Sequence, residues 1–353
     1  MRSLVQLRQA RREMTADEKR LRRKEFFINN SLYIFLIAAI VGIVIYDPRF
    51  LSVPSVVNIL SLSAANLPLA LGIAGAIILS GTDLSAGRAV GLVACVSASL
   101  LQMSGYPNKM FPELGALSLP VVLLIALAIG GVIGLVNGFC VAKFRLHPFI
   151  VTLATQLIIF GLLLMYLMIG NNNGQSLSGL DPSYTEFITG SFLRIGGTAI
   201  PNYVFYSIGI TVIMWFVWNK TVFGKNMFAV GSNEEAAKVS GVNVTATIIG
   251  VFVLAGVLYG VTGFIEAARI GSNSAATGLN YELDAIAACV IGGVSFVGGI
   301  GKIRGVILGV VLLRIIFVGL TFLSIDSNLQ YVIKGLIILV ACAIDMRKYL
   351  KRR

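Results

Sequence analysis

Charged residues are scarce in this chain of 353 residues, where they make up 12% of the sequence against 57% for hydrophobic residues. A soluble domain carries roughly twice that share of charge, about 25%. Several apolar runs also reach the roughly 20 residues that a helix needs to cross the hydrocarbon core of a bilayer. The composition therefore excludes an ordinary soluble domain and predicts an all-α polytopic membrane protein.

Histidine and cysteine are scarce as well, with one histidine and four cysteines in the whole chain. The cysteines all lie in apolar segments, and their spacing matches neither a zinc site nor a disulfide framework. They are Cys95, Cys140, Cys289 and Cys342. We therefore expect these cysteines to be small core residues, and we expect no metal site.

The sequence also lacks a complete phosphate-binding loop, which requires the pattern GxxxxGK[ST]. The nearest stretch is GGIGKIRG (298–305), where Phe296 replaces the first glycine and Ile303 replaces the Ser or Thr. The metalloprotease pattern HExxH and the hydrolase pattern GxSxG are absent too. These absences predict a chain that is not an enzyme and does not hydrolyse ATP by itself.

Basic residues are concentrated at the two ends of the chain. Nine Lys or Arg residues lie in the first 24 positions and five in the last seven. This distribution is typical of cytoplasmic flanks of membrane spans, so no nucleic-acid partner is expected. We predict a basic cytoplasmic segment at 1–30, one transmembrane domain at 31–346 and a basic cytoplasmic tail at 347–353.

Ten segments are predicted to be membrane spans. They are 31–46, 56–80, 85–103, 118–142, 148–169, 201–218, 244–265, 283–297, 303–323 and 328–345. With both termini in the cytoplasm, the internal loops 143–147, 219–243 and 298–304 carry most of the loop Lys and Arg residues, as the positive-inside rule requires. The eighth span is short and flanked by glycines, so it can be a half-helix.

Two stretches suggest an internal repeat. SGTDLSAGRAVGLVA (80–94) and GLNYELDAIAACVIGG (278–293) each place acids at the start of a helix rich in small residues. The first would begin inside and the second outside, which predicts two inverted repeats of five helices, a plan common in transporters.

A few polar residues near or within the spans are candidates for a substrate pathway, because polar groups at membrane depth are costly and often functional. The acids Asp83, Glu266, Glu282 and Asp284 can contact a polar substrate or cap helix starts. The neutral residues Asn66, Asn137, Thr155 and Gln156 suit an uncharged polyol, but they equally suit hydrogen bonds between helices. Both interpretations stay open for each residue.

The stretch SNEEAAKVSG (232–241) is hydrophilic and predicts a short helix on the cytoplasmic side. Ser232 and Glu235 have capping-box spacing, with Asn233 as the alternative cap, and Gly241 is a natural stop. An isolated helix of this length is marginal in water. We therefore expect it to pack on the membrane domain or on a partner protein.

These motifs together resemble a known family. GTDLSAGRAVGL, HPFIVTL, GKNMFAVGSNEEAAKVSGVNV and YELDAIAACVIGGVSFVGGIG are similar, in this order, to signature stretches of the monosaccharide ABC-importer permeases of the ribose and galactose type. The resemblance covers about residues 32–346. GTDLSAGR and EAARIGS are most similar to members that import galactose and methyl galactosides.

The resemblance implies an inner-membrane permease that works as a homodimer with an ATP-binding cassette subunit and a periplasmic sugar-binding protein. ATP would be bound by the partner subunit, and this chain would hold no cofactor. The stretch 219–243 would be the loop that contacts the ATPase, through Gly231, Ser232, Asn233, Glu234, Glu235, Ala236, Ala237, Lys238 and Gly241. The expected pathway residues are Asp83, Ser85, Asn137, Gln156, Glu282 and Asp284.

Three alternatives remain open. A permease of the same class could carry ribose, a nucleoside or another small polar solute. An ion-coupled carrier would require acids or a histidine at the middle of the membrane, whereas this sequence places its acids near span ends. An intramembrane enzyme would require a pairing of nucleophile and base that the sequence does not offer.

Overall fold

The computed structural model describes residues 31–115 and 117–350, and this part of the chain is mainly helical. Its elements are α3 (Ser31–Tyr46), the 3-10 turn η1 (Pro48–Leu51), α4 (Val53–Ile78), α5 (Ala86–Leu100), α6 (Leu119–Phe144), α7 (Pro148–Leu167), α8 (Pro182–Thr189), β1 (Leu193–Ile195), β2 (Thr198–Ile200), α9 (Asn202–Lys220), α10 (Val222–Ser232), α11 (Glu234–Val239), α12 (Val244–Ile270), α13 (Tyr281–Ile291), α14 (Ile303–Phe322) and α15 (Ser327–Leu350). The predicted segment 1–30 and the last three residues of the predicted tail 347–353 lie outside the described residues.

Each of the ten segments predicted as spans coincides with a helix. Within the described residues, five helices are long and apolar enough to cross a membrane, namely α4, α6, α7, α12 and α14. The helix α5 is apolar but shorter. The expectation of an all-helical membrane protein is therefore confirmed.

The helix α13 is shorter than predicted, because it ends at Ile291 instead of continuing to 297. Gly292 occupies its C-cap, and Gly293 has a φ of +84°, a left-handed conformation that ends a helix and favours glycine. Its 11 residues are about 16 Å long, roughly half of the ~30 Å hydrocarbon core. This length fits the expected half-helix.

The segment 170–200 contains more regular structure than the predicted loop. Pro182 begins α8 at a position that favours proline, and the Asp181 side chain caps this helix by accepting a hydrogen bond from Ser183 N. Hydrogen bonds from the Ser183 hydroxyl and backbone N–H lower the pKa of the Asp181 carboxyl. Strands β1 and β2 follow as an antiparallel hairpin. These elements are too short to give a clear hydrophobic period, so the sequence did not predict them.

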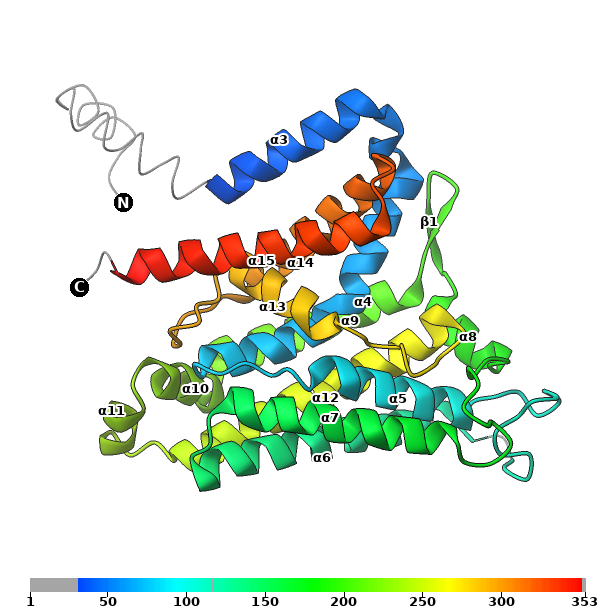
Figure 1. Cartoon of the computed structure of the whole chain (residues 1–353), viewed down its shortest axis with the longest axis horizontal. Helices are drawn as coiled ribbons and strands as arrows, with labels where there is room; N and C mark the ends of the chain where they lie inside the picture. The colour runs from blue at the N-terminus through cyan, green and yellow to red at the C-terminus, as the bar shows by residue number, and fades with distance from the viewer. Residues whose placement is uncertain (1–30, 116, 351–353) are drawn as a thin grey trace.

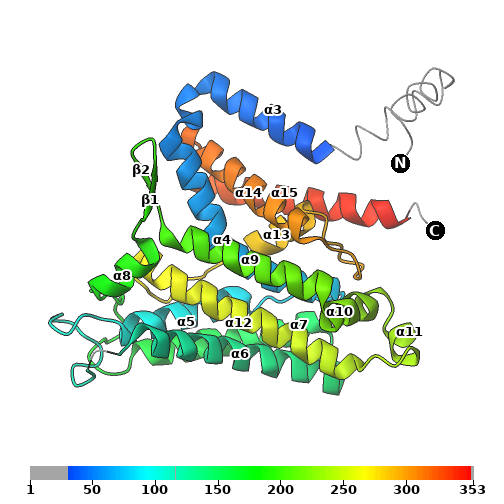
Figure 2. The ribbon, with the colours of Figure 1, turned by 180° about the vertical axis from the view of Figure 1, so that it is seen from behind.

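The helices form a bundle with distinct ends (Figure 1). The helix α8 and the hairpin lie at one end, whereas α10 and α11 lie at the other, where α3 begins and α15 ends. Seen from behind, α9 runs along the bundle between the hairpin and α10 (Figure 2). The helices α5, α6, α7 and α12 gather on one side and α13, α14 and α15 on the other, with α4 extending between them.

The helices α6 and α12 pack closely because glycines face each other across their interface. A Cβ atom on Gly130 would lie 2.9 Å from Gly260 N, and one on Gly256 would lie 3.0 Å from Gly134 N. Small residues allow such backbone approach in lipid, where the packing itself supplies the attraction. Other helix pairs also pack against each other: α14 on α4, α5 on α12, and α13 on α4.

Candidate functional site

A buried polar network surrounds the start of the short helix α5. Asp83 lies two residues before Ser85, and its Oδ1 accepts hydrogen bonds from the Ser85 backbone N–H (3.0 Å) and hydroxyl (2.6 Å). Its Oδ2 accepts one from the Tyr259 hydroxyl on α12 (3.1 Å). Asn137 on α6 donates to Ser85 Oγ over 2.9 Å. The network thus joins α5 to two long helices, and it brings together three of the predicted pathway residues.

Of the two interpretations left open for Asp83, the structure does not show helix capping. Ser85 occupies the N-cap of α5 and makes no capping hydrogen bond through its side chain. The Asp83 carboxylate binds the N–H of this N-cap residue instead of an N–H inside the helix. Both residues are fully buried. Because a buried polar group is costly unless it is hydrogen-bonded, these contacts account for a carboxylate at this depth.

The starts of α5 and α13 meet each other inside the protein. A Cβ atom on Gly87 would overlap the carbonyl oxygen of Gly278 and the Glu282 carboxylate, and one on Gly278 would overlap Gly87 O. Gly278 also has a φ of +77°, which favours glycine. These two short helices, of 15 and 11 residues and both called half-helices below, therefore approach through their first turns with no room for side chains at Gly87 or Gly278.

Glu282 lies at this crossing and is buried. Its Oε2 has no hydrogen-bond partner among the residues that the structure describes. The side chain of Asn137 has a similar feature, since its Oδ1 is buried without a described partner. Buried polar atoms without a hydrogen bond are uncommon in proteins, and a bound ligand can supply the missing partner. Glu282 and Asn137 are therefore buried predicted residues with unused capacity for a polar ligand.

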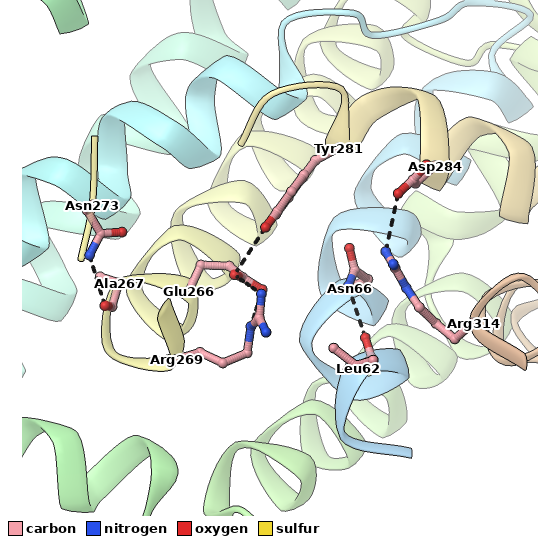
Figure 3. A network of polar contacts seen from close by, with 9 residues as sticks. All are labelled: Leu62, Asn66, Glu266, Ala267, Arg269, Asn273, Tyr281, Asp284 and Arg314. Atoms are coloured by element: carbon pink, nitrogen blue, oxygen red, sulfur yellow. Dashed lines mark hydrogen bonds and ion pairs between the residues drawn. The ribbon is translucent and has the colours of Figure 1, made fainter. Parts of the chain in front are cut away.

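Asp284, also on α13, is held by two basic residues that the sequence analysis did not identify. Arg314 on α14 donates to Asp284 Oδ2 over 3.4 Å, as Figure 3 shows. Lys334 on α15 places its Nζ 2.6 Å from Asp284 Oδ1. Lys334 also lies near the aromatic rings of Phe317 and Tyr331, 5.1 and 5.4 Å from their centroids. Asp284 is thus an ion-pair residue and not a helix cap.

A sequence signal for these two partners existed. Arg314 and Lys334 each lie in the middle of an apolar stretch, and a charge there indicates a buried partner of opposite sign. Asn66 on α4 completes the surroundings, because it lines a small cavity together with Asp284 and Arg314. In Figure 3 the Arg314 side chain extends from α14 toward Asp284 alongside Asn66.

A second ion pair lies within α12, and a tyrosine connects it to the start of α13. Arg269 donates two hydrogen bonds to the Glu266 carboxylate, of 2.9 and 2.7 Å, in a bidentate pair. The Tyr281 hydroxyl donates to Glu266 Oε2 over 3.4 Å (Figure 3). Glu266 is fully buried, so its charge is balanced by Arg269. The first turn of α13 is therefore anchored through Tyr281 on one side and through Asp284 on the other.

Gln156, the remaining predicted pathway residue, is not part of these networks. It lies half-buried on α7 and makes no hydrogen bond with the described residues. Within the described part of the chain, no group of three or more His, Cys, Asp or Glu side chains could hold a metal ion.

The hydrophilic stretch 232–241 contains one short helix, α11, and a further helix, α10, precedes it in the loop and ends at Ser232. Asn233 caps α11, since its Oδ1 accepts a hydrogen bond from Ala236 N over 2.9 Å. The capping box of Ser232 and Glu235 was wrong: Ser232 is the last residue of α10, and its hydroxyl donates back to Phe228 O. Gly241 follows the helix with a φ of +84°, as a stop requires.

The helix α11 presents most of its surface to solvent. Glu234, Glu235, Ala236 and Lys238 are exposed, whereas Ala237 and Gly231 are buried. Val239 is 89% exposed. The helix therefore packs on its own chain through Ala237 and leaves a mixed polar and apolar face uncovered.

Comparisons with known proteins place these features in a family. The family model described as "Branched-chain amino acid transport system / permease component" matches residues 55–342. The galactose/methyl galactoside import permease protein of Haemophilus influenzae is 46% identical over 326 residues, which cover 92% of this chain and 96% of that protein. The protein of the same name from Escherichia coli is 44% identical over 337 residues, covering 94% and 99%. The ribose import permease protein of Escherichia coli is 33% identical over 336 residues, covering 95% and 98%. No solved structure matches the chain.

Proposed function

This chain belongs to the family of branched-chain amino acid transport system permease components, and from that premise we propose that it is the permease subunit of a galactose or methyl galactoside ABC importer. The observation that carries the proposal is the nearly full-length similarity to galactose/methyl galactoside permeases, at a higher identity than to a ribose permease. Its five long apolar helices and its bacterial relatives fit a multi-pass protein of the inner membrane. The sequence-based assignment to sugar permeases is thereby confirmed.

We propose that residues 31–346 form one permease domain with ten spans and with both termini in the cytoplasm. The end of the bundle that carries α10 and α11 would face the cytoplasm, because α3 begins there and α15 ends there. The end with α8 and the hairpin would face the periplasm, where a sugar-binding protein can dock. The basic segments 1–30 and 347–353 would then meet the anionic inner leaflet.

The two five-helix halves would be inverted repeats of each other. In one half the long helix α4 leads into the short helix α5, and in the other the long helix α12 leads into the short helix α13. The packing is reciprocal, because α5 packs on α12 while α13 packs on α4. Transporters of this plan bind substrate where such interrupted helices meet. This reciprocity supports the repeat that the sequence suggested.

The sugar pathway is proposed to pass near the start of α13, with Glu282 and Asp284 as its acids and Asn137 and Gln156 as neutral contacts. Carboxylates and amides can accept and donate hydrogen bonds to sugar hydroxyls without a covalent step. Asp83 and Ser85 would hold the start of α5 in place for these contacts. Transport would proceed by alternating access, with no chemical change to the sugar.

The energy would come from a separate ATP-binding cassette subunit that contacts loop 219–243 and binds the ATP. A second copy of this chain would complete the pore. To test this assembly, the tagged chain is purified from its native membrane in mild detergent, and the proteins that accompany it are identified. A stoichiometric ATPase is expected; a pure homo-oligomer without any ATPase contradicts the proposal and favours an ion-coupled carrier.

The substrate is tested by uptake of labelled galactose into vesicles that contain the assembled importer and its binding protein. Unlabelled galactose and methyl galactoside should compete with the label, and ribose or a nucleoside should not. Competition by ribose alone would assign the chain to the ribose importers instead. Uptake that continues without ATP but follows an ion gradient would exclude the ABC mechanism.

A further inference from the structure

Three segments that are far apart in the sequence meet at the end of the bundle that carries α11. They are the turn after α4, the last residues of α10, and the loop after α13. Gly299 N donates to Ile78 O over 2.8 Å, and the Ser80 hydroxyl donates to Val297 O over 2.9 Å and lies 3.3 Å from Gly231 O. Ser80 thus contacts both of the other segments directly.

The three segments approach each other through their backbones. A Cβ atom on Gly231 would overlap the carbonyl oxygen of Ile78 and would lie 2.9 Å from Gly299 N. A Cβ atom on Gly298, which has a φ of +88°, would overlap the Ser80 hydroxyl. Ser80 itself has a φ of +61°, an uncommon conformation for a residue other than glycine. The three segments are therefore packed so closely that no side chain fits at Gly231 or Gly298.

Each segment leads directly to an element of the candidate site. The turn at Ser80 continues through Asp83 into the half-helix α5. The loop at 297–299 follows the half-helix α13, and Gly231 is two residues before Asn233, the cap of α11. One contact region consequently connects the exposed helix α11 to both half-helices whose first turns meet inside the protein.

We propose that this junction transmits the displacement of α11 to α5 and α13 at the same time, with Ser80, Gly231 and Gly298 as positioning residues. The inference rests on the proposed function, in which α11 contacts the ATPase. Close backbone contacts, together with the short Ser80 side chain, transmit displacement because densely packed groups have low compressibility. The half-helices then move together, and the polar crossing at Glu282 opens or closes as a unit.

The first test uses Ser80→Gly in the assembled importer, reconstituted with its ATPase and binding protein. This variant removes the hydroxyl that joins the segments, and glycine adopts the positive φ without strain, so the fold is retained. We expect the ATPase to co-purify normally and ATP hydrolysis to continue. The amount of sugar transported per ATP should fall about fivefold, the factor that corresponds to one ordinary hydrogen bond. Unchanged transport per ATP would overturn the proposal.

Two more variants are compared in the same measurement of sugar transported per ATP. Gly231→Ala introduces a Cβ where Ile78 O lies and should uncouple hydrolysis from transport more strongly. Its matched control is Gly209→Ala on α9, because a Cβ atom there meets nothing within 4 Å. Gly209→Ala should transport as the unmodified protein does. An equal loss in both variants would show that any added methyl group is harmful, and would contradict a specific role for the junction.

A second readout follows the junction itself by hydrogen exchange in the assembled importer. Addition of a non-hydrolysable ATP analogue should change the exchange of 78–86 and of 295–302 together in the unmodified protein. In Ser80→Gly, residues 232–240 should still respond while the other two segments respond separately or not at all. A joint response that persists in Ser80→Gly would refute the proposal. An unmodified chain that assembles with no ATPase would instead refute the proposed function, and the two failures are thus distinguishable.

Discussion

The hydroxyl of Tyr259, on α12, donates a 3.1 Å hydrogen bond to the carboxylate of Asp83, just before α5. The two residues are separated by 176 positions in the sequence, and both are buried. This bond fixes the entry to one half-helix against the long helix of the other half of the chain.

Replacement of Tyr259 with Phe should reduce sugar uptake while leaving the amount of protein in the membrane unchanged. The change removes one hydrogen bond, which contributes about 1 kcal/mol to stability, and leaves the ring in place. Uptake and membrane abundance are measured in parallel. Asp83→Asn should also reduce uptake and leave the amount of protein in the membrane unchanged. The fold is retained because the amide oxygen of asparagine can still accept the hydrogen bonds from Ser85. Disappearance of both variants from the membrane would show a purely structural role for this pair.

Loss of Asp284 should destabilise the protein more than loss of either basic partner. Asp284→Ala leaves Arg314 and Lys334 as half-buried cations without their acid, and breaking a fully buried pair costs about 3–5 kcal/mol, which is the upper bound here. Lys334→Met leaves Asp284 paired with Arg314, so a smaller loss is expected. Thermal unfolding in detergent gives the comparison. Equal melting temperatures for Asp284→Ala and the unmodified protein would contradict an energetically important cluster.

Glu235→Arg should weaken co-purification of the ATPase without affecting the fold, because the Glu235 side chain is exposed and only its charge reverses. The matched control is Glu186→Arg on α8, an exposed glutamate at the opposite end of the bundle. The control should retain the ATPase. If both variants retain it and also transport normally, the face of α11 at Glu235 is not a contact surface for the ATPase.

Gly256→Leu should prevent stable insertion, since the side chain would overlap the backbone of α6 at Gly130. Gly209→Leu is the control, because the space around that glycine is open. Membrane abundance and resistance to proteolysis distinguish the two. Normal abundance of Gly256→Leu would show that α6 and α12 can separate, which the close glycine contacts argue against.

Much of the architecture could be predicted from local patterns. The long apolar runs predicted helices whose ends agree with the structure within a few residues, as for 148–169 against Pro148–Leu167. The end of α13 was less accurate, because an apolar run continues beyond the glycines that stop the helix. The cap of α11 was also ambiguous, since both Ser232 and Asn233 favour that position and only the end of α10 decides between them.

The candidate site was predicted in composition but not in arrangement. The sequence identified Asp83, Ser85, Asn137, Glu282 and Asp284 as polar residues near or within apolar spans, where polar groups are costly. It did not indicate that Tyr259 bonds to Asp83, or that Arg314 and Lys334 neutralise Asp284. Those pairings join helices from distant parts of the chain, and no local spacing rule predicts them.

The sequence by itself determined that the chain is helical, lies in a membrane and belongs among sugar permeases, because apolar run length and motif order are local properties. Only the tertiary structure decided which polar groups are paired, which remain unpaired, and how α11 connects to the half-helices. The physical reason is that the energetic effect of a buried charge or of a glycine contact depends on the atoms that lie opposite it. In this chain the atoms opposite are often more than 150 residues away, as for Ser80 and Gly231.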